Sequence, residues 1–598
     1  MFKGFLFFLR EGWKCDKKYV LWLFAKQLIA ATLPIAGALL PKFLLDEVLG
    51  RAEVSTLISL VLGFALYILI ANALTEFFTW DEFTHRMQVF RKFHLKLYER
   101  LVYADYESID SAEYQQMRQR AEKFLYCNYK GFGYLLTCAV NILGQLLTLV
   151  GLIAVLSVLD AGFVLLFAAL TVLCSLIENR AAKKALAMHM KAADSERAIF
   201  YYSNLFQSAE YAKEIRLSAA QQPLLAHWLT AAKYNNSCYK GANRYHIRSG
   251  IARAGFGFVQ TCAAYLFMLQ KVLNDSMSVG TLTMCVGAVS SFSEALRSLL
   301  HSFNEIRAYD LYYDDLDTFL NRPAQLRESG KAPVEAQPHR IELRNVSFRY
   351  PGAETWSLKN VSLTLEKGQR LALVGENGSG KSTLVKLFCR LYDPTEGCIL
   401  LDGRDIRTLD YDSYLAQFST VLQDFKLFDL PVRENLTLGR DADDATLMEL
   451  LHRVGLDERI RTLPHGLDTH IGRTFSEEGF EPSGGEAQKL ALVRALLRDA
   501  PVIVLDEPAA ALDARAEYDL YRQFDELVQG RSAVYISHRM SSCRFCDRIA
   551  VLDGGELIEE GTHEELLARG GRYAELYTLQ AQYYLDQPSC EKPVQIDP

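Results

Sequence analysis

The sequence has no tail rich in lysine or arginine, and the net charge of its 598 residues is only -7. Nucleic-acid-binding domains usually concentrate positive charge on one face, so we expect no nucleic acid among the partners. The 12 cysteines are scattered, mostly within apolar runs, which is typical of reduced thiols rather than a disulfide framework. Two stretches, 56–113 and 180–222, contain no proline and can therefore form uninterrupted helices.

Long apolar runs fill the first half of the chain. Six of them reach the length that a helix needs to cross a membrane, and they lie at about 19–41, 57–74, 135–159, 162–177, 251–272 and 279–300. The first, third and fifth connections are short and carry almost no positive charge, whereas the second and fourth are long and rich in lysine and arginine. The positive-inside rule then predicts that both termini and the long connections lie in the cytoplasm. We expect a multi-pass protein of the plasma membrane.

Changes in composition divide the chain into five segments. An amphipathic helix at 1–18 is suited to the membrane surface. A transmembrane domain at 19–322 follows, with long helical extensions into the cytosol. A polar linker at 323–338 leads to an α/β domain at 339–580, and a polar tail occupies 581–598.

The α/β domain carries a predicted phosphate-binding loop. The domain opens with alternating apolar residues from Ile341 to Phe348, which predicts an antiparallel edge sheet. Residues 375–382 then read Gly-Glu-Asn-Gly-Ser-Gly-Lys-Ser between a predicted strand and a predicted helix. The glycines allow backbone amides to surround an anion, and the lysine and final serine suit phosphate and magnesium. The candidate nucleotide-binding residues here are Gly375, Asn377, Gly378, Ser379, Gly380, Lys381, Ser382 and Thr383.

Two adjacent carboxylates follow an apolar strand pattern at 501–505. Asp506 is a candidate magnesium ligand, together with Ser382. Glu507 is a candidate for polarising the water that attacks a γ-phosphate. The pair therefore predicts hydrolysis of the bound nucleotide.

A second glycine-rich turn opens a helix at 482–486. Its residues Ser483, Gly484, Gly485 and Glu486 resemble the Leu-Ser-Gly-Gly-Gln signature of ATP-binding-cassette (ABC) proteins. The resemblance extends over essentially the whole chain and is to an ABC exporter half-transporter. It implies a multi-domain fold: an all-α six-helix transmembrane domain, then an α/β P-loop nucleotide-binding domain with a helical subdomain.

The resemblance implies roles for further residues and two cofactors, ATP and Mg²⁺. Tyr350 resembles the aromatic residue that stacks on adenine, and Gln423 resembles the glutamine that contacts magnesium. Asp513 matches the loop that crosses to the partner subunit. His538 resembles the switch histidine on the γ-phosphate.

One phosphate loop and one signature per chain imply a dimer in which each ATP lies between two subunits. The implied function is ATP-driven export by alternating access, with turns near 105–114 and 213–220 resembling coupling helices. Pro482 and Glu486 depart from the usual Leu and Gln, and Glu486 adds negative charge near the nucleotide. A homodimer and an obligate heterodimer with one weaker site both remain open, as does a nucleotide-gated channel or sensor.

The sequence leaves the transported substrate open among drugs, lipids and peptides, with membrane lipid as a further partner. Ser290, Glu294 and Arg297 are candidate pore-lining residues because ionisable groups at membrane depth are usually functional. Glu294 and Arg297 are one helical turn apart and can also neutralise each other. Further polar residues in the apolar runs are Asn141, Gln145, Gln260, Ser291 and Ser293.

Overall fold

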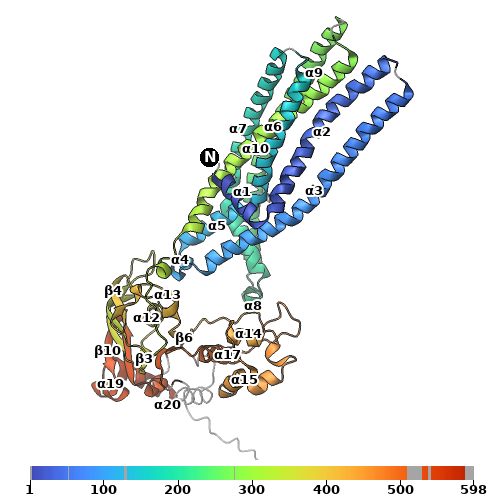
Figure 1. Cartoon of the computed structure of the whole chain (residues 1–598). Helices are drawn as coiled ribbons and strands as arrows, with labels where there is room; N and C mark the ends of the chain where they lie inside the picture. Colours follow the sequence, from blue (N-terminus) through green and yellow to red (C-terminus); the bar gives the residue numbers. More distant parts are fainter. Residues whose placement is uncertain are drawn as a thin grey trace, which may run out of the picture. The chain divides into compact units, whose positions relative to one another are not determined.

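The computed structural model describes residues 3–51, 53–126, 131–159, 161–274, 277–507, 528, 530–536 and 540–585. The chain forms two compact units (Figure 1). The first comprises Met1–Arg100 and Gln116–Asn321, and the second comprises Leu101–Gln115 and Arg322–Pro598. The second unit therefore includes a short segment from the second connection, the first of the two long ones.

The first unit is helical. Within the described residues, six helices are long and apolar enough to cross a membrane, which confirms the predicted number. The helices are α1 (Lys3–Cys15), α2 (Lys17–Leu49), α3 (Val54–Val102), α5 (Ala112–Tyr126), α6 (Gly131–Leu156), α7 (Ala161–Gln207), α8 (Ala209–Leu217), α9 (Gln221–Leu273) and α10 (Val279–Asn321).

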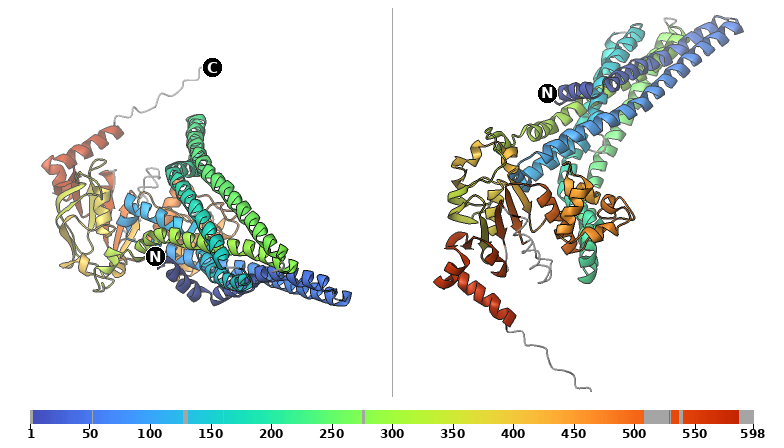
Figure 2. Two further views of the ribbon diagram at one scale, coloured as in Figure 1. Left: turned by 90° about the horizontal axis from the view of Figure 1, so that it is seen from above. Right: turned by 60° about the horizontal axis from the view of Figure 1, so that its bottom comes forward.

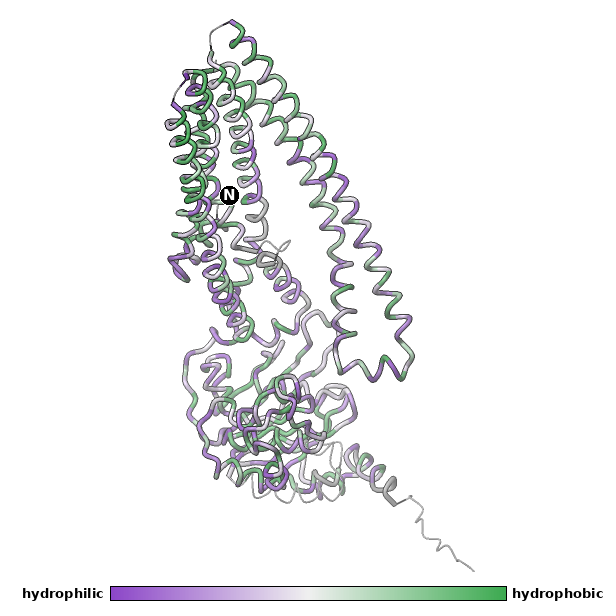
Figure 3. The backbone as a smooth tube through the Cα atoms, turned by 90° about the vertical axis from the view of Figure 1, so that its right-hand side faces the viewer, coloured by the Kyte–Doolittle hydropathy of each residue, from purple (hydrophilic) through white to green (hydrophobic). Residues whose placement is uncertain are grey.

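Three helices continue far beyond their apolar segments. The absence of proline predicts this for α3 and α7, whereas α9 has Pro223 in its first turn. α3, α7 and α9 contain 49, 47 and 53 residues. At 1.5 Å per residue, a helix of that length reaches roughly 75 Å. Figure 3 shows α7 and α9 as a hairpin whose hydrophobic residues gather toward one end and whose hydrophilic residues gather toward the other.

The N-terminal helix α1 uses its apolar face for packing within the unit. Phe8 is fully buried, and its ring lies 5.5 Å from that of Phe93 on α3. Asp16 then separates α1 from α2 and caps α2 by accepting a hydrogen bond from the Lys18 amide at 3.0 Å. At least part of the apolar face of the predicted amphipathic helix therefore packs against protein.

Asn141 connects three helices of the first unit. Its side-chain nitrogen donates to Ser298 at 3.0 Å and to Ser302 at 2.9 Å on α10. Its oxygen accepts from Gln27 of α2 at 2.9 Å and from Gln145 on its own helix at 3.0 Å. Polar groups at membrane depth thus satisfy one another, which holds α2, α6 and α10 together.

A second polar cluster joins α7 and α9. Gln260, which is buried, donates to the Phe167 carbonyl at 3.2 Å and to the Thr171 hydroxyl at 3.0 Å. Thr171 in turn lies 3.4 Å from the Ser293 hydroxyl of α10. These bonds give Gln260 and Ser293 a structural role within the bundle.

The candidate pore-lining residues have contacts within α10. Arg297 forms an ion pair with Glu294, and Ser290 donates to the Val286 carbonyl at 3.2 Å. Ser290 and Glu294 are both exposed in the isolated chain. Because they are four residues apart on one helix, they share a face.

The second unit contains two sheets, shown with their neighbouring helices in Figure 2. A four-stranded antiparallel sheet has the order β2-β1-β4-β5, which confirms the predicted antiparallel sheet. A six-stranded sheet has the order β10-β9-β3-β8-β7-β6, in which all pairs are parallel except β10 with β9. The strands are β1 (Ile341–Phe348), β2 (Leu358–Leu365), β3 (Arg370–Val374), β4 (Glu396–Leu401), β5 (Arg404–Asp405), β6 (Phe418–Val421), β7 (Val502–Asp506), β8 (Ser532–Ile536), β9 (Arg548–Asp553) and β10 (Glu556–Gly561).

The second unit also contains helices before, between and after its strands. A helical subdomain between β6 and β7 packs around Leu447, Leu451 and Leu490, which are fully buried. The helices are α4 (Tyr106–Asp110), α11 (Gln325–Glu328), α12 (Lys381–Phe388), α13 (Tyr411–Leu415), α14 (Val432–Thr437), α15 (Asp444–Arg453), α16 (Asp457–Arg461), α17 (Gly484–Leu497), α19 (His563–Arg569) and α20 (Arg572–Leu585).

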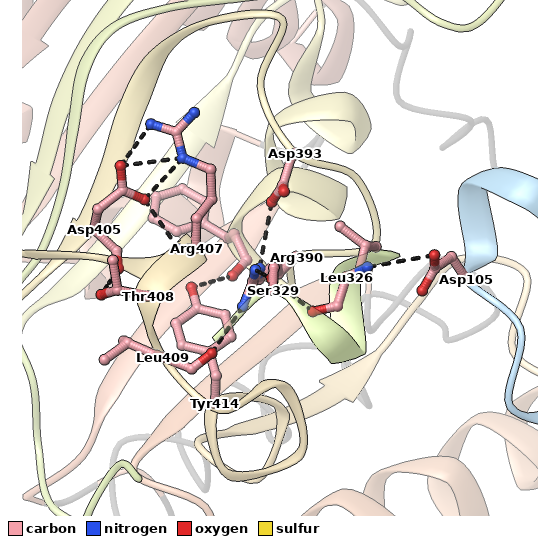
Figure 4. A network of polar contacts seen from close by, with 11 residues as sticks. Asp105, Leu326, Ser329, Arg390, Asp393, Asp405, Arg407, Thr408, Leu409 and Tyr414 are labelled. Carbon is pink, nitrogen blue, oxygen red and sulfur yellow. Dashed lines mark hydrogen bonds and ion pairs between the residues drawn. The ribbon is translucent and has the colours of Figure 1, made fainter. Parts of the chain in front are cut away.

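The segment 101–115 packs on the rest of the second unit through α4. The Tyr106 ring meets the Tyr392 ring edge-on at 5.6 Å, and the Tyr392 hydroxyl donates to Asp110 at 2.8 Å. The carboxylate of Asp105 accepts from the Leu326 amide at 3.3 Å (Figure 4). The turn predicted near 105–114 therefore has a docking surface on this unit.

The same region contains a fully buried arginine, Arg390, which follows the helix α12. Its guanidinium donates to Ser329 at 2.8 Å, to the Leu409 carbonyl at 3.3 Å and to Asp393 at 3.3 Å (Figure 4). The polar stretch predicted as a linker is thus packed on the unit, because Arg390 binds Ser329 and Leu326 is buried.

We expect the variant Asn141→Leu to destabilise the first unit. It removes hydrogen bonds to two other helices, and interhelical bonds of this kind contribute about 0.6–1.7 kcal/mol each. The matched control Gln145→Leu removes only the bond to Asn141 within α6. Thermal unfolding of the full chain in detergent should show a larger decrease in midpoint for Asn141→Leu, and equal decreases would refute the role of Asn141 as the connecting residue.

Candidate functional site

The parallel sheet brings three motifs to one edge. Ile536 at the end of β8 pairs with Leu373 of β3 on one side and with Asp506 of β7 on the other. β6 lies next to β7, with Val421 opposite Leu505. The segments that follow β3, β6 and β7 therefore leave the same edge, where ligands bind in open α/β sheets.

The phosphate loop needs its first and last glycines for space as well as conformation. Gly375 has a φ of 153° and Gly380 a φ of 102°, and both lie in a region that other residues rarely adopt. A Cβ atom on Gly375 would lie 2.2 Å from the Leu552 carbonyl oxygen, and one on Gly380 would lie 2.6 Å from the Leu358 side chain. Glycine is therefore required at both positions because β9 and β2 lie close to the loop.

Lys381 begins α12 and is directed back over its own loop. Its Nζ donates to the carbonyls of Gly375 and Glu376, both at 2.8 Å, and lies 3.5 Å from the Ser379 hydroxyl. Burial lowers its pKa, against the opposing effect of Glu507 and Asp506. The buried ammonium group of Lys381 is thus bound to the phosphate loop and also interacts with the charges of Asp506 and Glu507.

Asp506 is buried at the end of β7. Burial and the neighbouring Glu507 raise its pKa to about 6, although Lys381 and a hydrogen bond from Ser382 act in the other direction. Its Oδ1 has no hydrogen-bond partner in the described part of the chain. This oxygen and the neighbouring Ser382 hydroxyl are two oxygen ligands of the kind that magnesium binds. Asp506 and Ser382 therefore fit that ion.

The site offers a magnesium ion few protein ligands. Among the described residues, no group of three or more His, Cys, Asp or Glu side chains could hold a metal. Magnesium in nucleotide sites is usually held by one or two protein ligands and completed by phosphate oxygens and water. The arrangement therefore suits an ion that arrives with a nucleotide.

Glu507 has an unusual backbone conformation, with a φ of 51°. Its amide donates to the Ile536 carbonyl at 3.0 Å, and its carbonyl accepts from Gln488 of α17 at 2.8 Å. The Gln423 amide donates to its carboxylate at 3.3 Å. Strained backbone persists where surrounding contacts determine it, and these three contacts fix the direction of the carboxylate.

Gln488 is a site residue that the sequence motifs did not identify. It is buried on α17, the helix that Ser483 begins, and it links that helix to the Glu507 backbone. The sequence signal that could have identified Gln488 is a polar amide among the apolar residues of α17. A buried polar group of this kind requires a hydrogen-bond partner.

Tyr350 lies beside the phosphate loop. Its hydroxyl is 3.1 Å from that of Thr383, and Lys386 lies over its ring, 5.3 Å from the ring centre. A pocket of about 590 Å³ adjoins it. The residues around this pocket are Glu107, Phe348, Arg349, Tyr350, Pro351, Gly352, Ala353, Asp393, Pro394 and Thr395.

The signature turn forms a complete capping box on α17. The Ser483 hydroxyl accepts from the Glu486 amide at 3.3 Å, and the Glu486 carboxylate accepts from the Ser483 amide at 2.8 Å. Arg459 of α16 also donates to that carboxylate at 3.1 Å. Two other predicted site residues, Asp513 and His538, lie outside the described residues.

Comparisons with known proteins agree with these motifs. A family model described as ABC transporter matches residues 358–510. The subtilin transport ATP-binding protein SpaT of Bacillus subtilis is 28% identical over 560 residues, which is 92% of this chain and 90% of that protein. The ATP-dependent lipid A-core flippase of Burkholderia orbicola (strain AU 1054) is 34% identical over 344 residues, 57% of each protein, so this match spans about half the flippase.

The fold is similar to that of a solved transporter. A bacterial Atm1-family ABC exporter with ATP bound superposes with a TM-score of 0.79 at 24% identity, over 96% of this chain and 98% of that one. The chain thus carries an ABC transporter domain over residues 358–510 after six apolar helices, and its fold is similar to that of an ABC exporter. This similarity indicates an ATPase domain coupled to membrane transport.

Proposed function

We propose that the chain exports its substrate by alternating access as one half of a dimer. The observation that carries this proposal is that one sheet edge holds a phosphate loop and two carboxylates, and that the sequence contains one signature turn, at 482–486. Each ATP would lie between the phosphate loop of one subunit and the Ser483 turn of the other. Binding would draw the two nucleotide-binding units together, and hydrolysis would release them.

Five side chains have proposed roles in hydrolysis. Ser382, Gln423 and Asp506 would hold a magnesium ion, which would neutralise charge on the phosphates. Glu507 would accept a proton from the attacking water, with Gln423 and the Gln488–Glu507 backbone contact directing its carboxylate. Lys381 would leave the loop carbonyls for the phosphates.

Further proposed roles rest on motif position. His538 would contact the γ-phosphate, and Asp513 would lie at the crossing to the partner. Tyr350 would stack on adenine next to its pocket. Asn377 and the loop glycines would offer backbone amides to the phosphates.

We propose an amphiphilic substrate, taken from the plasma membrane or its cytoplasmic face. SpaT is named for subtilin transport and the flippase for lipid A-core. In this chain the exposed Ser290 and Glu294 share one face of α10, and Arg297 neutralises Glu294 in part. Such a face suits a substrate that has both polar and apolar parts.

An obligate heterodimer is the second candidate. It is favoured by Pro482 and Glu486, which differ from the usual signature. Purification of this chain alone as an active ATPase dimer would exclude it. A mixture active only with a second half-transporter would support it.

Replacing Glu507 with Gln should lower ATPase turnover by roughly 10²–10⁴, the usual contribution of a general base. The amide keeps the shape of the side chain, so ATP binding should persist. The control Glu481→Gln removes an exposed carboxylate from the same unit and should leave turnover unchanged. Measured in the reconstituted dimer, equal turnover of Glu507→Gln and the unaltered protein would remove Glu507 from this role.

Replacing Asp506 with Asn should stabilise the nucleotide-free protein at pH 7.5. Because its folded pKa of about 6 exceeds the ordinary 3.8, the folded state binds the proton more tightly and loses stability as pH rises from about 4 to 6. The variant avoids that loss, which is on the order of 1–3 kcal/mol.

Calorimetric unfolding with EDTA tests this expectation. The gain should disappear near pH 4, and the exposed control Asp441→Asn should show no gain at either pH. Destabilisation by Asp506→Asn at pH 7.5 would contradict it.

The substrate class can be tested with a panel of lipids, hydrophobic peptides and drugs. We expect amphiphiles to stimulate the ATPase of the reconstituted dimer. Glu294→Gln should change the concentration that gives half-maximal stimulation, whereas basal turnover should change little. Stimulation only by fully water-soluble compounds would contradict the proposed substrate class.

A further inference from the structure

Arg459 and Glu486 form a contact that the general signature motif does not contain. Arg459 lies on α16 and Glu486 in the first turn of α17, and their Nε and Oε1 atoms are 3.1 Å apart. Phe480, which is buried, lies under the guanidinium at 5.2 Å from the ring centre. The arginine is therefore held between an aromatic face and a carboxylate.

The two oxygens of Glu486 have separate partners. Oε2 accepts from the Ser483 amide at 2.8 Å, and Oε1 accepts from Arg459. A glutamine has only one oxygen for these two donors, and its NH₂ group would face the guanidinium. The carboxylate at this position is thus matched to the arginine.

The charge of Glu486 is stable in this setting. Burial alone would raise its pKa, but the Ser483 hydrogen bonds and the positive charge of Arg459 lower it. The side chain therefore carries a full negative charge at neutral pH. Without Arg459, that charge would stand one helical turn from the amides that are proposed to receive the partner's γ-phosphate.

We propose that Arg459 is a positioning residue for ATP binding: it neutralises Glu486 and keeps the Ser483 turn receptive to phosphate. This inference rests on the proposed function, in which the turn faces the nucleotide of the partner subunit. Arg459 and Glu486 then act as one unit that replaces the usual neutral glutamine. The phosphate contacts themselves remain with Ser483 and the amides of α17.

The test is a double-mutant cycle on the full chain, reconstituted as the dimer. Arg459→Met should raise the KM for ATP about three- to tenfold, because an uncompensated negative charge repels the phosphates across a partly screened distance. Its effect on kcat should be smaller. In a Glu486→Gln background, the same Arg459→Met change should alter the KM less than twofold.

Two further variants separate charge from structure. Arg459→Lys keeps the charge and should keep the KM within about twofold, since a lysine can still pair with the carboxylate. Arg461→Met removes a charge from the same helix, where Arg461 pairs at 3.9 Å with Asp457, and should leave the KM unchanged. The increase caused by Arg459→Met should also shrink at high salt.

The outcomes distinguish this inference from the proposed function. Equal effects of Arg459→Met in the unaltered protein and in the Glu486→Gln background would show a merely structural contact and overturn the inference. An unchanged KM in the Arg459→Met protein would do the same. If the proposed function itself were wrong, the result would differ. The unaltered protein would have no ATPase activity, or Glu507→Gln would not change that activity.

Discussion

The parallel pairing of β3, β8 and β7 is the constraint on which the site depends. Ile536 lies between Leu373 and Asp506 in the ladder, so the phosphate loop and the carboxylates leave the sheet at the same edge. A shift of one residue would turn Asp506 to the other face of the sheet. The buried positions of β7 and β8 resist such a shift because every residue in both strands is buried.

The region around Arg390 links that sheet edge to the membrane domain's sequence. α12 carries the phosphate loop at its start, and Arg390 lies just beyond its end. Arg390 binds Ser329 in the segment after α10, and Tyr392 binds α4. Both bound segments are continuous in sequence with the first unit, through α10 and α3, which contain 43 and 49 residues.

Sequence patterns predicted the elements better than their contacts. Hydrophobic length was enough for the six helices, and the absence of proline was enough for the extensions of α3 and α7, because both depend on local chemistry. Gly375 and Gly380 were found by spacing, although their need for space comes from β9 and β2. Gln488 and Arg459 were not found, because their partners are 19 and 27 positions away and are brought near only by tertiary packing.

The same limit applies to charge. Read alone, Glu486 predicts a negative charge beside the nucleotide and hence a weakened site. Its neighbours change that expectation, since Arg459 supplies the opposite charge from another helix and Ser483 uses the second oxygen as a cap. The electrostatic reason for two unequal sites therefore loses force, and Pro482 remains as the departure that favours a heterodimer. Proline cannot donate a backbone hydrogen bond, but the capping box begins at Ser483, so the amides proposed to meet phosphate are all present.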